Sequence, residues 1–167
     1  MAAFFSLDLL LKIVFAFIAS VSFAVILKVD KRHLLLSGVG AIMTYFIYAL
    51  MCALGTSFFA AAFVSTIASV IYAEILARVR RAPAIVYIMT GVIPTVPGGD
   101  LYHAMRYLIM SDLPMAMKKL TDTLQIGLGI AGGIVTASIL FSIGFDAYRR
   151  AKKRIAELKE AIDPNSR

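Results

Sequence analysis

The chain has little of what soluble enzymes and metalloproteins use. Its 167 residues include one cysteine, no tryptophan and two histidines. One cysteine, Cys52, excludes an intrachain disulfide and a cysteine-based zinc site, and in its apolar run we interpret it as a small hydrophobic side chain. His33 and His103 lack ligand-like spacing. The sequence also shows no nucleophile–base set and no glycine-rich nucleotide loop, so we expect a protein that is not an enzyme and has no metal or cofactor.

Charge is also scarce. Charged residues make up 16% of the chain and hydrophobic residues 60%, with a mean hydropathy of +0.86. Soluble domains average about 25% charged and about 45–50% apolar residues. This contrast excludes a soluble fold or a disordered chain and indicates an integral membrane protein. The first eight residues carry no cation, so we expect no cleaved signal peptide.

Several apolar runs are long enough to cross a bilayer, which takes about 20 residues. Four are complete: Leu9–Leu27, Leu34–Leu54, Thr56–Leu76 and Thr123–Phe145. A fifth, Pro83–Val96, is too short, and the segment Pro94–Asp100 that interrupts it holds two prolines and two glycines. Helical spacing resumes after this break, so we join Pro83–Val96 to Asp100–Met110 as one broken span. The alternative places Asp100–Leu120 on the membrane surface as an amphipathic segment.

The predicted fold is therefore an all-α integral membrane protein with about five transmembrane helices, the fourth broken at a Pro-Gly motif. Residues 1–147 form the membrane domain and 148–167 a basic helical tail. Thirteen of the seventeen cations lie in residues 28–32, 78–81 and 149–167. With five spans, all three segments lie on the same side of the membrane. With four spans, the second and third segments would lie on opposite sides. Positive charge marks the cytoplasmic side, so we predict an outside N-terminus and a cytoplasmic C-terminus, and we interpret the net charge of +7 as a topology signal, without nucleic-acid binding.

The break is the first candidate site. Irregular backbone at membrane depth has free N–H and C=O groups, which need hydrogen-bond partners from protein or from a water-filled cavity. Transporters often bind small ions at broken helices of this kind. Glycine amides at a helix start favour a carboxylate. The alternative is a kinked helix in which Asp100 is an ordinary N-cap, and a third option makes Asp100 a proton or cation site. The candidate pathway residues here are Pro94, Thr95, Pro97, Gly98, Gly99 and Asp100.

Four more residues are candidates. Lys12 either snorkels to the outer interface beside an aspartate four residues earlier or faces a cavity and binds a carboxylate. Tyr102 and Arg106 contact substrate if the second half-helix lines a cavity, and lipid headgroups otherwise. Glu74 precedes an arginine by four residues, which predicts an interfacial ion pair, with proton coupling as the alternative.

Small residues mark helix-packing faces. The run Thr56–Leu76 is rich in alanine and serine, and Gly129 and Gly133 form a GxxxG pattern in the last span. Such stripes let membrane helices approach closely.

The segment Gly91–Tyr102, which reads GVIPTVPGGDLY, resembles the Pro-x-x-Pro-Gly-x-x-x-Tyr region of the threonine/serine exporter (ThrE-type) superfamily. The resemblance covers Leu9–Phe145, and the short length resembles the small subunit of the two-component branch. It implies export of hydroxy amino acids or succinate, a second membrane subunit of the same family as partner, and importance for Pro94, Pro97, Gly98 and Tyr102.

Two hypotheses follow. In the first, the chain is a subunit of a secondary exporter of small carboxylates or amino acids in the bacterial cytoplasmic (inner) membrane, acting with a second subunit or as a homo-oligomer. The broken helix lines the pathway, and the proton gradient or substrate efflux drives export. In the second, the chain is a non-transporting scaffold or assembly subunit whose partner holds the whole pathway.

Overall fold

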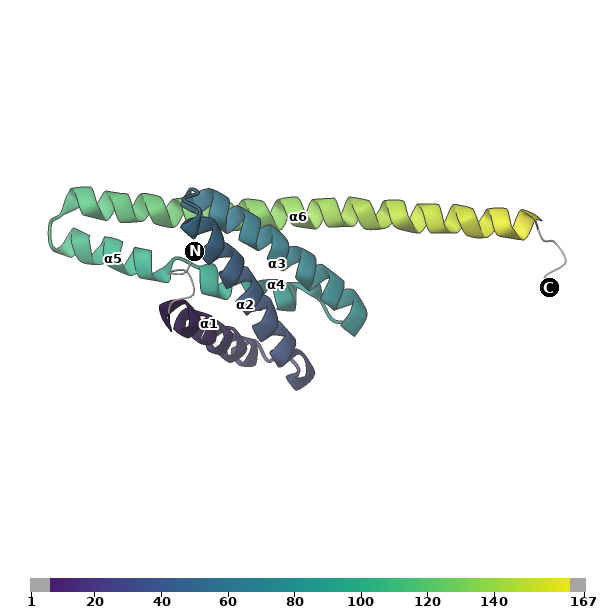
Figure 1. The fold of residues 1–167 in the computed structure, drawn as a ribbon, viewed down its shortest axis with the longest axis horizontal. Helices are drawn as coiled ribbons and strands as arrows, with labels where there is room; N and C mark the ends of the chain where they lie inside the picture. Colours follow the sequence, from purple (N-terminus) through teal and green to yellow (C-terminus); the bar gives the residue numbers. More distant parts are fainter. Residues whose placement is uncertain (1–6, 163–167) are drawn as a thin grey trace.

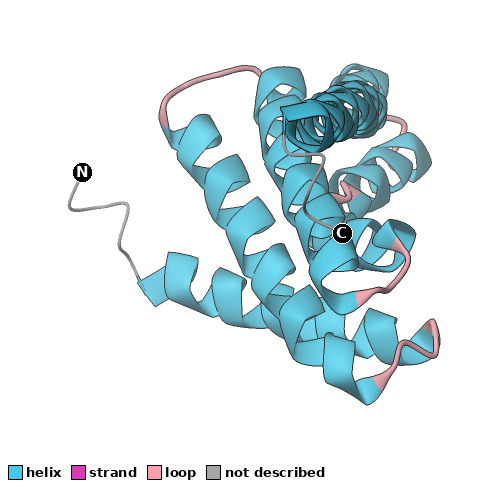
Figure 2. Cartoon of the chain, turned by 90° about the vertical axis from the view of Figure 1, so that its right-hand side faces the viewer, coloured by secondary structure: helices cyan, strands magenta, loops and turns pink. Residues whose placement is uncertain are grey.

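The computed structural model describes residues 7–162, and in that range it contains helices and loops without a strand (Figure 2). Most of the helices are long enough to be membrane spans. Their order along the chain is α1 (Leu7–Ile26), α2 (Lys31–Ala53), α3 (Phe58–Arg80), α4 (Ala84–Val92), the short 3-10 helix η2 (Ile93–Thr95), α5 (Gly98–Ile109) and α6 (Leu113–Ile162).

Helix α6 runs along the whole length of the molecule, and α3 and α5 pack against it (Figure 1). Its 50 residues span about 75 Å at 1.5 Å per residue. Helices α1 to α4 form a tilted bundle below its middle, while α5 packs mainly against the beginning of α6 and projects from the bundle with it. The molecule therefore has two parts, a bundle and a projecting hairpin.

The predicted fold class is confirmed. Helices α1, α2, α3 and α6 are each long and apolar enough to cross a membrane, and α4–η2 and α5 make a fifth candidate span with a bend of 47° at the break. Residues 100–120 form a helical hairpin, with a turn at 110–112. The alternative that residues 100–120 lie on the membrane surface stays open, because the bent pair is a candidate span by length and composition alone.

Helices α3 and α6 run in the same direction. Gly129 of α6 lies against the carbonyl oxygen of Phe59 at the start of α3, and Phe145 lies under the guanidinium of Arg78 near the end of α3. Because α3 and α6 are parallel, the chain between them must travel back along the bundle. The broken pair α4–α5 makes that return, which supports five crossings.

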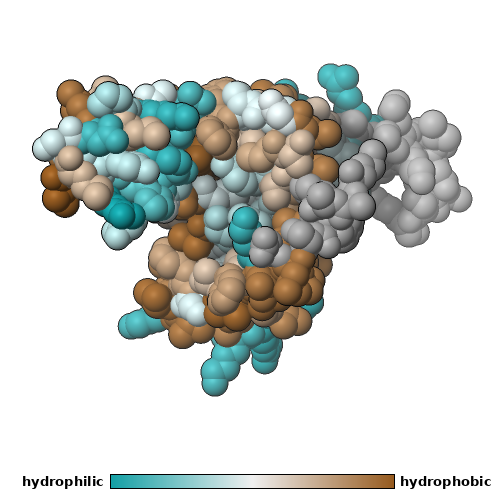
Figure 3. All heavy atoms as spheres, turned by 60° about the vertical axis from the view of Figure 1, so that its left-hand side comes forward, coloured by the Kyte–Doolittle hydropathy of each residue, from teal (hydrophilic) through white to brown (hydrophobic). Residues whose placement is uncertain are grey.

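The interior is built from small and hydroxyl-bearing side chains. The largest fully buried ones are Tyr87, Val70, Thr44, Thr66 and Thr90. Large apolar side chains point outward instead, and Figure 3 shows the resulting hydrophobic surface over the lower bundle, with hydrophilic groups gathered on the projecting part. Because lipid is as apolar as leucine, burying large apolar side chains does not drive membrane helices together. Close packing of small residues stabilises their contact instead.

The predicted small-residue faces meet each other inside the chain. A Cβ on Gly129 would stand 2.6 Å from the carbonyl oxygen of Phe59, and one on Gly133 would stand 2.8 Å from Cβ of Thr66. Ala61, Ala62 and other small residues of α3 are buried in the bundle. The GxxxG pattern of α6 therefore serves packing between α3 and α6.

Local signals account for several helix ends. Ser57 caps α3 by accepting a bond from the N–H of Ala60 at 3.3 Å, and Arg81 ends it with φ 54°. Asp112 caps the next helix, because its Oδ1 accepts the N–H of Met115 at 3.3 Å and α6 begins at Leu113. Helix α6 then continues through residues 147 and 148 to Ile162. The division into a membrane domain and a tail stays a prediction, and residues 163–167 of that tail lie outside the described range.

Candidate functional site

The break between α4 and α5 consists of a 3-10 turn followed by an extended residue. Pro94 and Pro97 have no N–H to donate, so the α-helical bond ladder cannot continue through them. Thr95 is buried, and its hydroxyl donates to the carbonyl of Val92 at 2.7 Å. The carbonyl of Ile93 accepts from the N–H of Val96 at 3.2 Å. The break is thus an ordered element of the fold, as the two prolines predict.

The start of α5 is uncovered. Gly98 and Gly99 are exposed, and no heavy atom lies within 4 Å of the position that a Cβ would take on either. The N–H of Gly98 donates to the carbonyl of Val96 at 2.8 Å, which leaves the amides of Gly99 and Asp100 without a partner among the described residues. Neighbouring atoms therefore do not require glycine here, but its small size keeps this positive helix end accessible.

Asp100 is not the N-cap of α5. Pro97 takes that position, and Asp100 lies in the first turn. Its Oδ1 pairs with Nζ of Lys119 on α6 at 2.7 Å, with side chains 30% and 33% exposed respectively. The position of Asp100 within the first turn therefore corrects the N-cap interpretation. The ion pair with Lys119 balances the charge of Asp100, which would otherwise oppose an anion at the same helix end.

Lys119 was missed at the sequence level. The turn at 110–112 could have revealed it. In two antiparallel helices joined by a turn, a residue before the turn lies beside the residue that follows the turn at a similar distance along the chain. Asp100 precedes that turn and Lys119 follows it, so the hairpin brings them together.

Three other predicted site residues lie on the outer surface of the chain. Tyr102 is 66% exposed, with its ring edge-on to His103 at 5.4 Å between centroids. Arg106 is exposed further along α5, and Lys12 is exposed on α1. The partner predicted for Lys12, Asp8, has a side chain outside the described residues. The structure thus does not bury these three residues in a cavity of this chain.

Glu74 forms the predicted ion pair. Its Oε2 lies 2.8 Å from Nη1 of Arg78, and the same guanidinium lies 4.4 Å and 4.2 Å from the ring centroids of Phe141 and Phe145. This pair ties the end of α3 to α6. Proton coupling through Glu74 stays a prediction.

A second set of polar residues, which sequence analysis did not single out, lies inside the bundle. Ser20 Oγ of α1 donates to the carbonyl of Thr90 at 2.8 Å and lies 3.3 Å from the carbonyl oxygen of Ser37, its alternative acceptor. Thr44 Oγ1 donates to the carbonyl of Gly40 at 2.8 Å. Ser20, Ser37, Thr44 and Thr90 are all at most 1% exposed. Isolated hydroxyls in apolar runs are the only sequence signal for this set.

His33 and Tyr87 join the beginnings of α2 and α4. The Tyr87 hydroxyl lies 2.6 Å from Nδ1 of His33, and the rings meet edge-on. Tyr87 is 2% exposed, so its hydroxyl depends on this partner.

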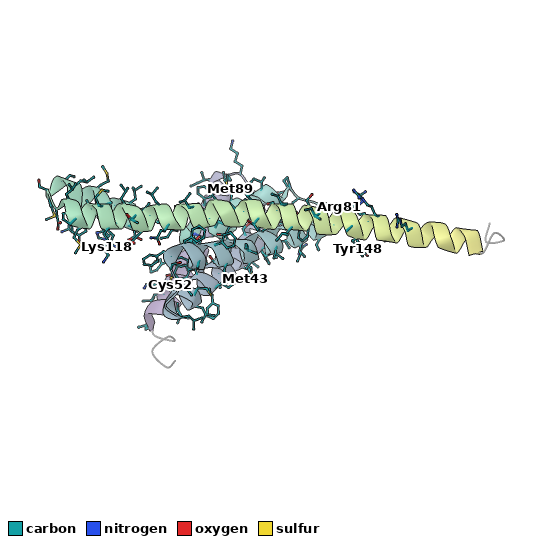
Figure 4. The ribbon with its side chains drawn as sticks, turned by 90° about the horizontal axis from the view of Figure 1, so that it is seen from above. Met43, Cys52, Arg81, Met89, Lys118 and Tyr148 are labelled. Carbon is teal, nitrogen blue, oxygen red and sulfur yellow. The ribbon has the colours of Figure 1, made fainter. Side chains whose placement is uncertain are left out.

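The three basic segments gather at one end of the bundle. The bond between His33 and Tyr87 brings the segment 28–32 close to the segment 78–81, because Tyr87 follows Arg81 by six residues. The contact between Arg78 and Phe145 places the start of the basic tail there too. Figure 4 shows Arg81 and Tyr148 toward one end of the long axis and Lys118 toward the other.

Comparison with known families identifies the family of this chain. Residues 12–140 match the family model described as Threonine/Serine exporter, ThrE. The chain belongs to the threonine/serine exporter family. This match confirms the predicted family, and the matched range contains the break and the Asp100–Lys119 pair. Searches of curated proteins and of solved structures gave no significant match.

Proposed function

We propose that this chain is a subunit of a secondary exporter of amino acids or small carboxylates, in which the broken helix α4–α5 lines the pathway. The observation that carries the proposal is the uncovered start of α5 beside the ion pair of Asp100 and Lys119. Family membership supports export of the threonine/serine type.

The charges at this point suit a zwitterion. The free amides at the start of α5 and the ammonium of Lys119 attract a carboxylate, and the carboxylate of Asp100 attracts an ammonium group. An α-amino acid carries both groups and can exchange with the existing ion pair. A dicarboxylate such as succinate offers no cation to Asp100, so this site favours an amino acid.

The pathway is completed by a second protein surface. Helix α5 packs mainly against α6, which leaves its other face bare, including Leu101 at 47%, Met105 at 55% and Ile109 at 84% exposed. Tyr102 and Arg106 belong to the same exposed part of α5. A second membrane subunit of the family, or a second copy of this chain, would cover this face, and the lipid bilayer would cover the remaining apolar surface.

The orientation follows from the basic end of the bundle. Positive residues flank the cytoplasmic ends of membrane helices, so we place the three basic segments in the cytoplasm of a bacterium and the chain in its inner membrane. The N-terminus and the turn at 110–112 then lie outside.

Threonine export from cells tests the proposal, with Pro97→Ala and Gly98→Leu as the altered proteins. Pro97→Ala restores an amide in the break and Gly98→Leu covers the start of α5, so each should lower export about tenfold or more at normal membrane levels. The control is Gly144→Leu, because no atom lies near that glycine either and it lies away from the break, next to the Phe145 that contacts Arg78. Unchanged export in both altered proteins would reject the pathway role. Full transport by the partner alone in vesicles would make the chain a scaffold instead.

A further inference from the structure

The end of α6 extends beyond the other helices that the structure describes. The guanidinium of Arg78, near the end of α3, lies over Phe145 of α6, whereas α6 continues to Ile162. Figure 1 shows this last part of α6, coloured yellow, without a neighbouring helix. Tyr148 is 63% exposed. Residues 148–162, which we call the tail helix, are therefore left uncovered by the rest of the described chain.

The tail helix has an apolar stripe at the spacing of a coiled coil. Apolar residues recur at alternating intervals of three and four, which are the a and d positions of the heptad. This spacing keeps the stripe along one side of the helix. The stripe consists of Tyr148, Ala151, Ile155, Leu158 and Ile162. Such a pattern predicts that the tail helix packs lengthwise against another helix.

This stripe continues the face of α6 that packs inside the bundle. About eighteen residues complete five helical turns. Ile155 therefore lies in line with Ala137, which is 2% exposed in the core of the bundle. Ala151 lies in line with Gly133, which packs against Thr66 of α3. The face thus has a helix partner as far as α3 reaches, and it loses that partner where the tail helix begins.

Cations flank the stripe on both sides. Lys152 and Lys159 occupy e positions, and Arg154 occupies a g position. Glu157 and Glu160 belong to the opposite side of the helix, at c and f. Residues at e and g meet the flanks of the neighbouring helix in a coiled coil and determine which partner it accepts. The tail helix is therefore complementary to a helix that has carboxylates beside its own apolar stripe.

A second copy of the chain does not offer this complementarity. Two copies inserted the same way in one membrane would bring their tail helices together in parallel. In a parallel pair, a g residue faces the e residue of the next heptad on the other helix, so Arg154 of one copy would face Lys159 of the other. Like charges that meet across an interface repel each other. The charges therefore favour a partner with a different sequence.

The lipid surface does not fit the direction of the tail helix. Helix α6 is unbroken from Leu113 to Ile162, and after Gly144 the sequence has no proline or glycine before Pro164. Its length of about 75 Å exceeds the hydrocarbon thickness of about 30 Å, so an end that continues a membrane span leads away from the bilayer. A helix bound to the lipid surface lies in the plane of the membrane instead.

We propose that the tail helix is a docking site for an acidic amphipathic helix of another protein, whose carboxylates lie beside Lys152, Arg154 and Lys159. The stripe covers about two heptads, which is short for a coiled coil, so this contact by itself is weak. A partner held in the same complex gains effective concentration and binds more tightly. Docking does not depend on the exported substrate and is separate from the proposed function.

The test uses the full-length protein in nanodiscs of neutral phosphatidylcholine. The probe is a fluorescent synthetic peptide of about four heptads, with leucine at a and d and glutamate at e and g. A second peptide has lysine at e and g. Fluorescence anisotropy should show saturable binding of the glutamate peptide, about tenfold tighter than that of the lysine peptide, with a smaller difference at high salt. Equal binding of the two peptides, or no binding of either, would overturn the proposal.

Two neighbouring lysines separate the flanking charge from the overall charge. Lys152→Gln removes a cation beside the stripe, and Lys153→Gln removes one from the f position on the far side of the same helix. We expect the first change to weaken binding of the glutamate peptide about two- to fivefold, the usual range for an exposed ion pair. The second should leave binding unchanged. Equal effects of the two changes would contradict the assignment.

A charge reversal gives a result that loss of folding cannot imitate. Lys152→Glu, Arg154→Glu and Lys159→Glu in one chain should transfer the preference from the glutamate peptide to the lysine peptide. Ile155→Ser in the unreversed chain should weaken binding of the glutamate peptide about tenfold, because it removes apolar contact from the stripe. Failure of the reversed chain to gain binding of the lysine peptide would count against docking through these flanks.

A single cysteine distinguishes the three occupants of the stripe. In a Cys52→Ser background, Ala151→Cys should react with a maleimide in nanodiscs of phosphatidylcholine and of phosphatidylglycerol, and the glutamate peptide should protect it in both. Protection by phosphatidylglycerol alone would assign the stripe to the lipid surface. A disulfide between two chains would assign it to a second copy. Either of these outcomes would reject a separate protein partner.

Discussion

Lys119 of α6 reaches back to Asp100 in the first turn of α5, with 2.7 Å between Nζ and Oδ1. The contact joins the two arms of the projecting hairpin next to the break in the fourth span. It also places one cation and one anion beside the uncovered amides of the half-helix. These are the opposite charges that a zwitterionic substrate would need.

The first prediction concerns this ion pair. Asp100→Asn and Lys119→Gln should each lower threonine export about tenfold or more, because each removes one of the two charges that a zwitterion meets. The matched control is Lys118→Gln, which neutralises the exposed neighbouring lysine and should leave export unchanged. Export assays at equal membrane levels measure the effect, and wild-type export by Lys119→Gln would count against the role.

The second prediction concerns the seam between α3 and α6. Gly129→Val should destabilise the protein by about 1–3 kcal/mol through overpacking, because its Cβ would lie 2.6 Å from the carbonyl oxygen of Phe59. Gly127→Val is the control on the same helix, since nothing lies within 4 Å of its Cβ position. Both changes have the same cost in helix propensity. Thermal unfolding in detergent compares the two variants. Equal Tm values would contradict the close contact of Gly129 with α3.

The third prediction concerns His33 and Tyr87, whose contact of 2.6 Å ties the start of α4 to the start of α2. Tyr87→Phe and His33→Phe should each cost about 0.5–1.5 kcal/mol, the usual net worth of a hydrogen bond. If the two groups act through this bond, the double variant should cost less than the two single changes together. Strict additivity in denaturant unfolding would show that the bond contributes nothing.

The fourth prediction concerns the number of crossings. In a Cys52→Ser background, Ser111→Cys should react with a membrane-impermeant maleimide on intact cells, because the turn between α5 and α6 is exposed and lies outside in our orientation. Asp30→Cys, in the loop before α2, should react only after permeabilisation. Labelling of both positions from the same side would mean that α4 and α5 do not cross the membrane together.

Much of the architecture was predictable because it depends on local properties. The length of an apolar run decides whether a helix can span a bilayer. The break at Pro94 and Pro97 was predictable too, because a proline lacks an N–H in any fold and so interrupts a helix. The ion pair of Glu74 and Arg78 was also predictable, because positions four apart meet on any helix. The Pro-Gly pattern, together with the number of apolar runs and the short length, resembled the family that the match over residues 12–140 then showed.

The partners of the site residues were not predictable in this way. Asp100 meets Lys119, Ser69 meets Gly91, and Gly129 meets Phe59, and each of these contacts depends on which helices are neighbours and how they are rotated. In a membrane helix the apolar residues cover every face, so periodicity carries little information on rotation. The N-cap interpretation of Asp100 failed for a local reason, because α5 begins two residues earlier, at Gly98.

The sequence by itself determined that the chain is a helical membrane protein of the threonine/serine exporter family, with one broken span and its positive charge concentrated in three segments. The tertiary structure alone decided that this break carries a neutralised carboxylate at an open helix start, and that the hydroxyl of Ser69 packs against Gly91 of a neighbouring helix. The physical reason is that hydropathy and chain stiffness act along the sequence, whereas charge pairing and close packing act between segments that only folding brings together.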